Sequence, residues 1–282
     1  MCSSQFDSWS LILDGLCESP HDFPARWALM LTMYLDESIE QEDGYVVIAG
    51  FLGKKSSWVR CARRWRGELG AHKSLHLKTL RGWHTNRNKN LLERLGKVPD
   101  SCGLTLVHCS VKVSDYRDLV AGTMVELNNA GYLTALRILV VNVINNLPVG
   151  ERLEVICEAQ PTYAARREIL FSLLNSMPEF QDRHGFPKLA KWSSVPKSTL
   201  LEASDYACYA LLQRLRDAAS RRAVLCSPIL SGRYYIGGHV SRDQARTTLT
   251  SMKAADKDFF EPFTKGEQKD LLRQLGDLTK QL

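Results

Sequence analysis

Five short segments with the residue preferences of β-strands recur along the chain, and each of the last three is followed by a stretch with helical periodicity. The expected strands cover residues 28–36, 44–52, 104–113, 152–158 and 188–195, and the expected helices cover 114–147, 162–176 and 198–216. Strands that begin as a hairpin and then alternate with helices are typical of a mixed sheet covered by helices. We therefore expect an α/β fold with a five-stranded mixed sheet.

The domain organisation is read from the absence of any repeat, low-complexity tract or long Gly/Ser linker. Residues 28–216 are assigned to one domain, with a helical insertion at about 56–96. Residues 1–27 form a poorly patterned lead-in, and 217–282 are expected to be a helical appendix. Within that appendix, helices are predicted over 241–252 and 265–282.

Composition indicates the cellular compartment and the kinds of binding partner that we expect. No apolar run reaches the roughly 18 residues that a membrane helix needs, and the first residues lack the positively charged leader of a secretory signal. The eight cysteines are scattered without a Cys-x-x-Cys pair, which favours free thiols in a reducing cytoplasm. The net charge of +6 permits a polyanionic partner without requiring one.

Three carboxylates fall where a strand ends or a helix follows a strand. Asp36 and Glu158 each close an apolar strand, and Asp205 lies two turns into the helix that follows the fifth strand. Functional groups of open α/β sheets gather at the carboxyl ends of strands, and clustered carboxylates repel one another unless a cation neutralises them. Because carboxylate oxygens suit Mg²⁺ or Mn²⁺, we expect these three acids to be metal ligands.

Each acid also has a simpler explanation. Asp36 and Glu37 could be turn residues, Glu158 could cap the next helix, and Asp205 could lie on a helix surface. The residues on both sides of Asp205 are small, which favours a helix whose backbone lies close to a sheet. This pattern argues against a position of Asp205 on an exposed helix surface.

Four segments, taken in order, resemble a known family. Residues 34–38 (Tyr-Leu-Asp-Glu-Ser), 44–51, 75–80 and 198–207 together are similar to domain-of-unknown-function family 3800, which looks like a branch of the ribonuclease H-like superfamily. That family opens with Asp-Glu-Ser on its first strand and closes with a Gln-x-Ala-Asp helix. The resemblance covers about residues 30–216 and implies a ribonuclease H-like fold.

The resemblance also implies further site residues. Glu126 is the candidate for an additional acid on the helix after the third strand, and Glu37 would act beside the metal ligands. His76 and Lys78 lie in a recurrent segment, so they would approach the substrate phosphate, where Lys78 would stabilise developing negative charge. Glu202 departs from the family pattern, which more often has Gln at that place.

Basic residues surround two tryptophans in the segment 54–66. We expect the tryptophans to pack in the core and the basic residues to bind substrate phosphates, although a solvated helix face would have the same composition. The pair Arg166-Arg167 is expected on a helix surface. The candidate substrate-binding residues of the segment are Lys54, Lys55, Arg60, Arg63 and Arg64.

These features predict a Mg²⁺- or Mn²⁺-dependent nuclease that hydrolyses DNA or RNA. Two such ions roughly 3.5–4 Å apart could activate a water and stabilise the leaving oxygen. The alternatives are a non-catalytic nucleic-acid-binding or assembly protein, and a component of a defence or mobile-element system that acts only with its partner. Any of these proteins could act with a protein partner or as a homo-oligomer.

Overall fold

The computed structural model describes most of the chain between residues 30 and 255. The gaps lie at 41–43, 71, 73, 76, 78–79, 81, 84, 118–126, 149–150, 177, 182–187, 196–197 and 233. The strands are β1 (Met30–Ile39), β2 (Tyr45–Lys54), β3 (Thr105–Lys112), β4 (Arg152–Glu158), β5 (Leu189–Val195) and β6 (Tyr235–His239). The α-helices are α2 (Lys55–Leu69), α3 (Asn86–Ser101), α5 (Leu127–Asn145), α6 (Pro161–Ser176), α7 (Thr199–Arg216), α8 (Arg221–Cys226) and α9 (Arg242–Ala255). Three short 3₁₀ turns are η2 (Val113–Asp115), η3 (Pro178–Phe180) and η4 (Ser227–Leu230).

One mixed sheet with the strand order β5-β4-β1-β2-β3-β6 organises the fold. Strands β1, β2 and β3 are antiparallel neighbours, while β4 runs parallel to β1 and β5 runs parallel to β4. The carboxyl ends of β1, β4 and β5 therefore lie at the same edge of the sheet. The predicted α/β class is confirmed.

The sheet has six strands, so the predicted number of five is wrong. The additional strand, β6, comes from the segment predicted to be a helical appendix, and it pairs in parallel with β3. Its sequence, Tyr-Ile-Gly-Gly-His, is short and contains two glycines, so it lacks the alternating pattern that marks a strand. Gly237 adopts a φ of 133° and lies so close to β3 that a Cβ there would be 1.6 Å from the carbonyl oxygen of His108.

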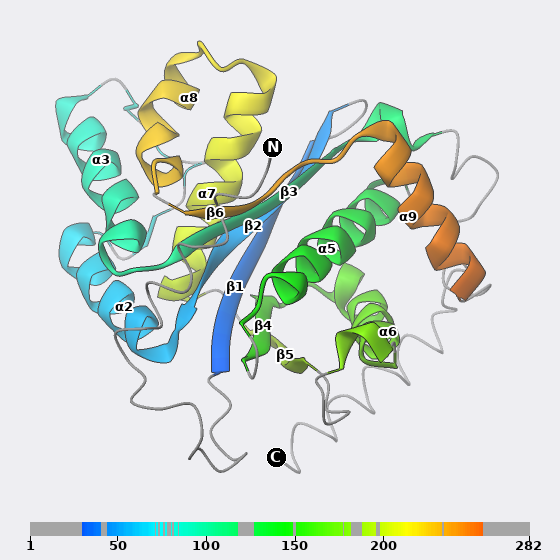
Figure 1. The fold of residues 1–282 in the computed structure, drawn as a ribbon. Coiled ribbons are helices and arrows are strands. Elements are labelled where there is room, and N and C mark those ends of the chain that lie inside the picture. The colour runs from blue at the N-terminus through cyan, green and yellow to red at the C-terminus, as the bar shows by residue number, and fades with distance from the viewer. Residues whose placement is uncertain are drawn as a thin grey trace, which may run out of the picture.

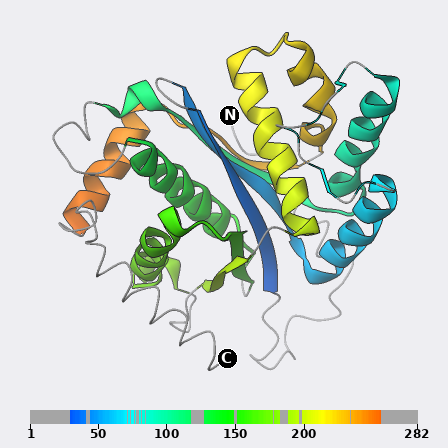
Figure 2. The same cartoon turned by 180° about the vertical axis from the view of Figure 1, so that it is seen from behind.

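Helices cover both faces of the sheet. Helices α5, α6 and α9 lie on one face, and α2, α3, α7 and α8 lie on the other, as the two opposite views show (Figures 1 and 2). Each face has its own core of buried apolar side chains. Among the described residues, no helix combines the length and the apolarity needed to cross a bilayer.

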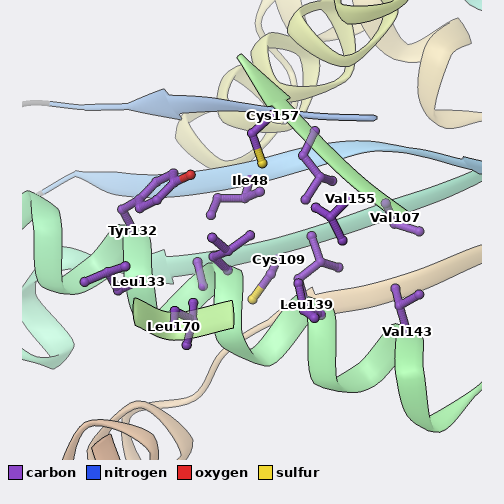
Figure 3. Close-up of a cluster of buried hydrophobic side chains, with 14 of the residues drawn as sticks. Ile48, Val107, Cys109, Tyr132, Leu133, Leu139, Val143, Val155, Cys157 and Leu170 are labelled. Carbon is purple, nitrogen blue, oxygen red and sulfur yellow. The ribbon is translucent and has the colours of Figure 1, made fainter. Parts of the chain in front are cut away.

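Helix α5 is largely buried, because it packs against the sheet, α6 and α9. Figure 3 shows side chains of Leu133, Leu139 and Val143 from this helix among Ile48, Val107 and Val155 from the sheet. Burying a side chain of this size contributes roughly 1.5–3 kcal/mol relative to leaving it exposed. The sequence predicted helical material over 114–147. Helix α5 begins at Leu127, and the described residues before the gap at 118–126 include the 3₁₀ turn η2.

Helix α7 approaches the other face of the sheet at unusually short range. A Cβ at Gly50 of β2 would lie 1.8 Å from the carbonyl oxygen of Tyr34 and 3.0 Å from Oγ of Ser204. Ser204 Oγ donates a hydrogen bond to that same carbonyl (3.0 Å), and Cys208 Sγ donates to the carbonyl of Asp36 (2.9 Å). The small residues predicted to bring this helix close to a sheet therefore do so.

Candidate functional site

Asp36 and Glu158 lie next to each other on the face of the sheet that α7 covers. The parallel register pairs Leu35 with Cys157, and both of those side chains belong to the core beneath α5. Because side chains alternate along a strand, the residues that follow them, Asp36 and Glu158, point to the opposite face. Asp36 is buried, with 4% of its surface exposed, and Glu158 is half-buried at the end of β4.

Asp205 joins this pair from α7. It is half-buried and lies between Ser204 and Cys208, which fix the helix to the carbonyls of Tyr34 and Asp36. Three acids that are far apart in the sequence therefore come from β1, β4 and α7 into one region between the helix and the sheet. The charges of Asp205 and Glu158 both act on Asp36, and a shared metal site formed by the three acids stays a prediction.

The electrostatics of Asp36 reflect this gathering of negative charge. Burial, followed by the charges of Glu37 and Asp205 and, to a smaller extent, Glu158, raises the pKa of Asp36 to about 8. The backbone N–H of Glu37 donates to Asp36 Oδ1 (2.8 Å) and acts in the opposite direction. A carboxyl group of this kind binds a proton near neutral pH, and a divalent cation in the same place would favour its ionised form.

The three carboxylates are suitable ligands for a hard cation, but their side chains are not positioned to coordinate one in this structure. Within the described ranges, no group of three or more His, Cys, Asp or Glu residues has the arrangement needed to hold a metal ion. Carboxylate oxygens from Asp36, Glu158 and Asp205 are nevertheless the ligand type that Mg²⁺ and Mn²⁺ prefer. Ligation would require these side chains to turn toward a common point.

The structure revises the position of Asp36 within its strand. The sequence predicted a strand that ends at this residue, but the ladder between β1 and β2 continues through Ile39, where it pairs with Val46. Asp36 and Glu37 are therefore ladder residues, and the explanation that treats them as turn residues is wrong. Asp36 can lie inside a strand because its side chain faces α7, where Asp205 and solvent-accessible Glu158 are close.

Glu37 points, by the same alternation, to the face of the sheet that α5 and α6 cover. There its charge acts on Tyr132, Cys157 and Arg167. The sequence predicted that Glu37 would act beside the metal ligands, and its influence on the pKa of Asp36 shows that the two carboxylates are near each other across the strand. Its participation in chemistry remains a prediction.

Arg167 is the residue of this region that the sequence reasoning missed. It was expected on a helix surface, but only 2% of it is exposed, so that prediction is wrong. Its Nη1 donates to the carbonyl of Glu158 (3.0 Å). Burial alone would lower the pKa of Arg167, but Tyr132, Cys157 and Glu37 surround the guanidinium and hold the pKa above its ordinary value.

The helical period of α6 could have revealed this burial. Tyr163, Leu170 and Leu174 are buried and lie four positions before, three after and seven after Arg167. Those intervals place all four side chains on one helix face. An arginine on an apolar stripe is a signal for a buried cation with a specific partner.

Several predicted site residues lie outside the described residues. These are Glu126, His76 and Lys78. The segment around the last two is nevertheless anchored near α7: Leu75 and Leu77 are buried, and the backbone N–H of Leu75 donates to Glu202 (3.4 Å). Glu202 also accepts from the indole N–H of Trp65 (3.0 Å), so its carboxylate joins α2, α7 and this segment.

In the basic segment 54–66, some side chains pack or make hydrogen bonds within the fold, and others are exposed. Trp58 and Trp65 are buried, which confirms that they belong to the core. Arg60 donates to the carbonyl of Cys102 (3.0 Å) and Arg64 to that of Ser101 (3.3 Å), so both satisfy acceptors at the end of α3. Lys55 and Arg63 are exposed.

The start of this segment also lies at the other end of the sheet from the acids. Lys54 pairs with Leu31, five residues before Asp36 on β1, which corresponds to roughly 17 Å along the strand. The structure therefore does not bring Lys54 and Lys55 to the acidic region. Their predicted role as phosphate ligands requires a substrate that extends from one edge of the sheet to the other.

Comparison of the chain with protein-family models, with curated proteins and with solved structures found no match.

Proposed function

We propose that this protein is a divalent-metal-dependent nuclease with a ribonuclease H-like fold that hydrolyses phosphodiester bonds of DNA or RNA. The observation that carries the proposal is the gathering of Asp36, Glu158 and Asp205 between one face of the sheet and α7. The four-segment resemblance to domain-of-unknown-function family 3800 supports it independently of that geometry.

The topology supports the fold part of the proposal. Three consecutive antiparallel strands, β1 to β3, are followed by β4 and β5, which extend the sheet in parallel on the other side of β1. This arrangement is compatible with the ribonuclease H-like core that the resemblance implies. The central position of β1 places Asp36 between a hairpin that anchors it and a parallel strand that supplies Glu158.

The proposed chemistry assigns a role to each acid. Asp36, Glu158 and Asp205 would hold Mg²⁺ or Mn²⁺, which lowers the pKa of bound water and stabilises the leaving oxygen of a phosphodiester. Asp36 is buried and its raised pKa favours the protonated form, so it would release its proton when the cation binds. Asp205 and Glu158 are half-buried and provide the side of the site that a substrate phosphate can reach.

A cleavage assay tests the proposal. Purified protein would be incubated with Mn²⁺ or Mg²⁺ and with labelled single- and double-stranded DNA and RNA. We expect metal-dependent cleavage of at least one substrate and a loss of at least about 100-fold in Asp36→Asn and Asp205→Asn, because a lost ligand removes most of the metal's contribution. Asp243→Asn, an exposed carboxylate on α9, is the control and should cleave normally.

The outcome that contradicts the nuclease is full activity in either ligand variant, with the melting temperature of each variant showing that it is folded. The second candidate, a nucleic-acid-binding protein without turnover, is favoured by the absence of a preformed metal arrangement among the described acids. Calorimetric titration with Mn²⁺ separates the two: no heat of binding at millimolar metal, with nucleic-acid binding retained, would favour the second.

A further inference from the structure

A groove lies on the same face of the sheet as α7 but on the far side of that helix from the acids. It has a volume of about 680 Å³ and is bordered by α3, the end of α7, α8 and η4. Its apolar surface includes Val224, Leu225 and Leu230, and its charged residues are Lys89, Glu93, Lys97 and Arg214. We call it the α3–α8 groove.

The charge of the groove favours an anion. Its lining has three basic residues and one acidic residue, which leaves a net charge of +2. Glu93 is already paired with Lys97 (2.6 Å). Within the described part of the chain, the ion pairs do not include Lys89 or Arg214, so both cations are available to a ligand at the groove.

Exposed aromatic side chains lie at the start of β6. Tyr235, the first residue of β6, is 61% exposed and stacks on His108 of β3, with ring centroids 6.1 Å apart and planes inclined by 26°. Tyr234 is 42% exposed, and Val224 inside the groove is 58% exposed. Arg214 connects the two parts, because its charge acts on His108 while its side chain lines the groove.

We propose that the α3–α8 groove and Tyr235 together bind single-stranded nucleic acid, with phosphates at Lys89 and Arg214 and a base stacked on Tyr235. Proteins that bind single strands combine a positively charged groove with aromatic side chains on which bases stack. A duplex would keep its bases paired and away from Tyr235. A neutral protein surface would bury Lys89 and Arg214 without a compensating charge, which is costly.

The groove is separate from the acidic region. Asp205 and Arg214 are nine residues apart on α7, which places them on opposite sides of the helix and roughly 13 Å apart along its axis. Figure 2 shows α7 standing between β1 and the pair formed by α3 and α8. The inference rests on the proposed function only in naming a nucleic acid as ligand, and it requires neither metal nor cleavage.

Fluorescence anisotropy tests it with 5′-labelled dT and rU oligonucleotides of about 15 residues in EDTA, where no metal-dependent cleavage occurs. We expect Tyr235→Ala to weaken binding about tenfold, because stacking of one base contributes roughly 1–3 kcal/mol. Tyr235→Phe keeps the ring and should bind like the wild type. The variant Lys89→Gln/Arg214→Gln should reduce the slope of log K against log salt by about 1.4, since two phosphate contacts are lost.

The matched control is Arg242→Gln/Arg246→Gln, which removes two exposed cations from α9 on the opposite face of the sheet and should change the affinity less than twofold. Because binding is measured in EDTA, the result does not depend on the proposed metal site. The inference is overturned if no oligonucleotide binds, if Tyr235→Ala and the groove variant bind like the wild type, or if the α9 variant loses as much affinity. It is also overturned if a poly-glutamate peptide of equal charge competes equally well, because the groove would then accept any polyanion.

Discussion

Asp36 combines burial at the centre of the sheet with a raised pKa, and this combination has a measurable consequence for stability. Its pKa is 3.8 in an unfolded chain and about 8 in the folded protein. Between about pH 4 and pH 8, the folded protein therefore binds a proton that the unfolded chain releases. In the absence of metal, the free energy of unfolding therefore falls as the pH rises through this range.

Replacement of this carboxyl by an amide should remove the effect. In EDTA, Asp36→Asn should raise the free energy of unfolding by at least about 1 kcal/mol at pH 8 and should change it little at pH 4. Urea denaturation at both pH values measures this, with Asp243→Asn as the exposed control. Equal or lower stability of Asp36→Asn at pH 8 would show that Asp36 is not held in its neutral form.

Arg167 supports the same edge of the sheet from the opposite face. Arg167 donates a hydrogen bond to the carbonyl of Glu158, and the charge of Glu37 acts on its guanidinium. Removing the charge of Glu37 or of Arg167 would therefore leave the other charge buried without this compensation. We expect Arg167→Met to destabilise the protein by about 3 kcal/mol. The double variant Glu37→Gln/Arg167→Met should cost at least about 1 kcal/mol less than the sum of the single changes. Strict additivity in urea denaturation would refute this coupling.

The sequence pointed to the three acids but not to the buried Arg167 on the opposite face of the sheet. Asp36 and Glu158 were recognisable because each interrupts or closes an apolar strand, and the parallel register then places them side by side. Arg167 was assigned to a surface because two adjacent arginines suggest exposure. Whether a helix residue faces solvent depends on which stripe the rest of the helix buries, and only the packing of α6 settles that.

At the scale of elements, the contact between α7 and β2 determines where Asp205 lies. Gly50 has no room for a side chain, since a Cβ would meet the carbonyl of Tyr34 at 1.8 Å. Gly50→Ala should therefore disturb the pairing of β1 with β2, displace Ser204 of α7, whose Oγ would lie 3.0 Å from the added carbon, and destabilise the protein by about 3 kcal/mol. Gly67→Ala is the matched control: a Cβ there meets nothing within 4 Å, and alanine in the last turn of α2 should stabilise the helix by up to roughly 0.5–1 kcal/mol.

Thermal unfolding of both variants measures the difference. A Gly50→Ala protein as stable as the wild type would mean that neither the β1–β2 pairing nor the position of α7 depends on the missing side chain at this residue. If the contact between α7 and β2 does fix Asp205, Gly50→Ala should also weaken Mn²⁺ binding, whereas Gly67→Ala should leave it unchanged.

Most elements were predictable because their patterns are local. Strand β4 covers the residues expected from its apolar run, and α7 begins within one residue of its predicted start. Strand β6 was not predictable, because two of its five residues are glycines and its pairing with β3 is set by a contact over more than 100 positions. The same kind of long-range contact creates the α3–α8 groove, whose residues come from three separate helices.

At the scale of the whole molecule, the order β5-β4-β1-β2-β3-β6 explains how acids that are far apart in the sequence come to lie in one region of the fold. Strand β1 is central, so a hairpin partner holds it on one side and the parallel strand β4 supplies Glu158 on the other. Helix α7 then crosses this centre and adds Asp205. Each acid depends on a different long-range contact, and for this reason the site forms only when the whole sheet is assembled.

The most direct test of this account is a crystal structure of the protein soaked in millimolar Mn²⁺, with anomalous diffraction recorded to locate the metal. The account predicts an anomalous peak between β1, β4 and α7, at roughly 2.0–2.2 Å from carboxylate oxygens of Asp36 and Asp205 and within reach of Glu158. Crystals that show no peak there, with the three carboxylates directed away from one another, would contradict it.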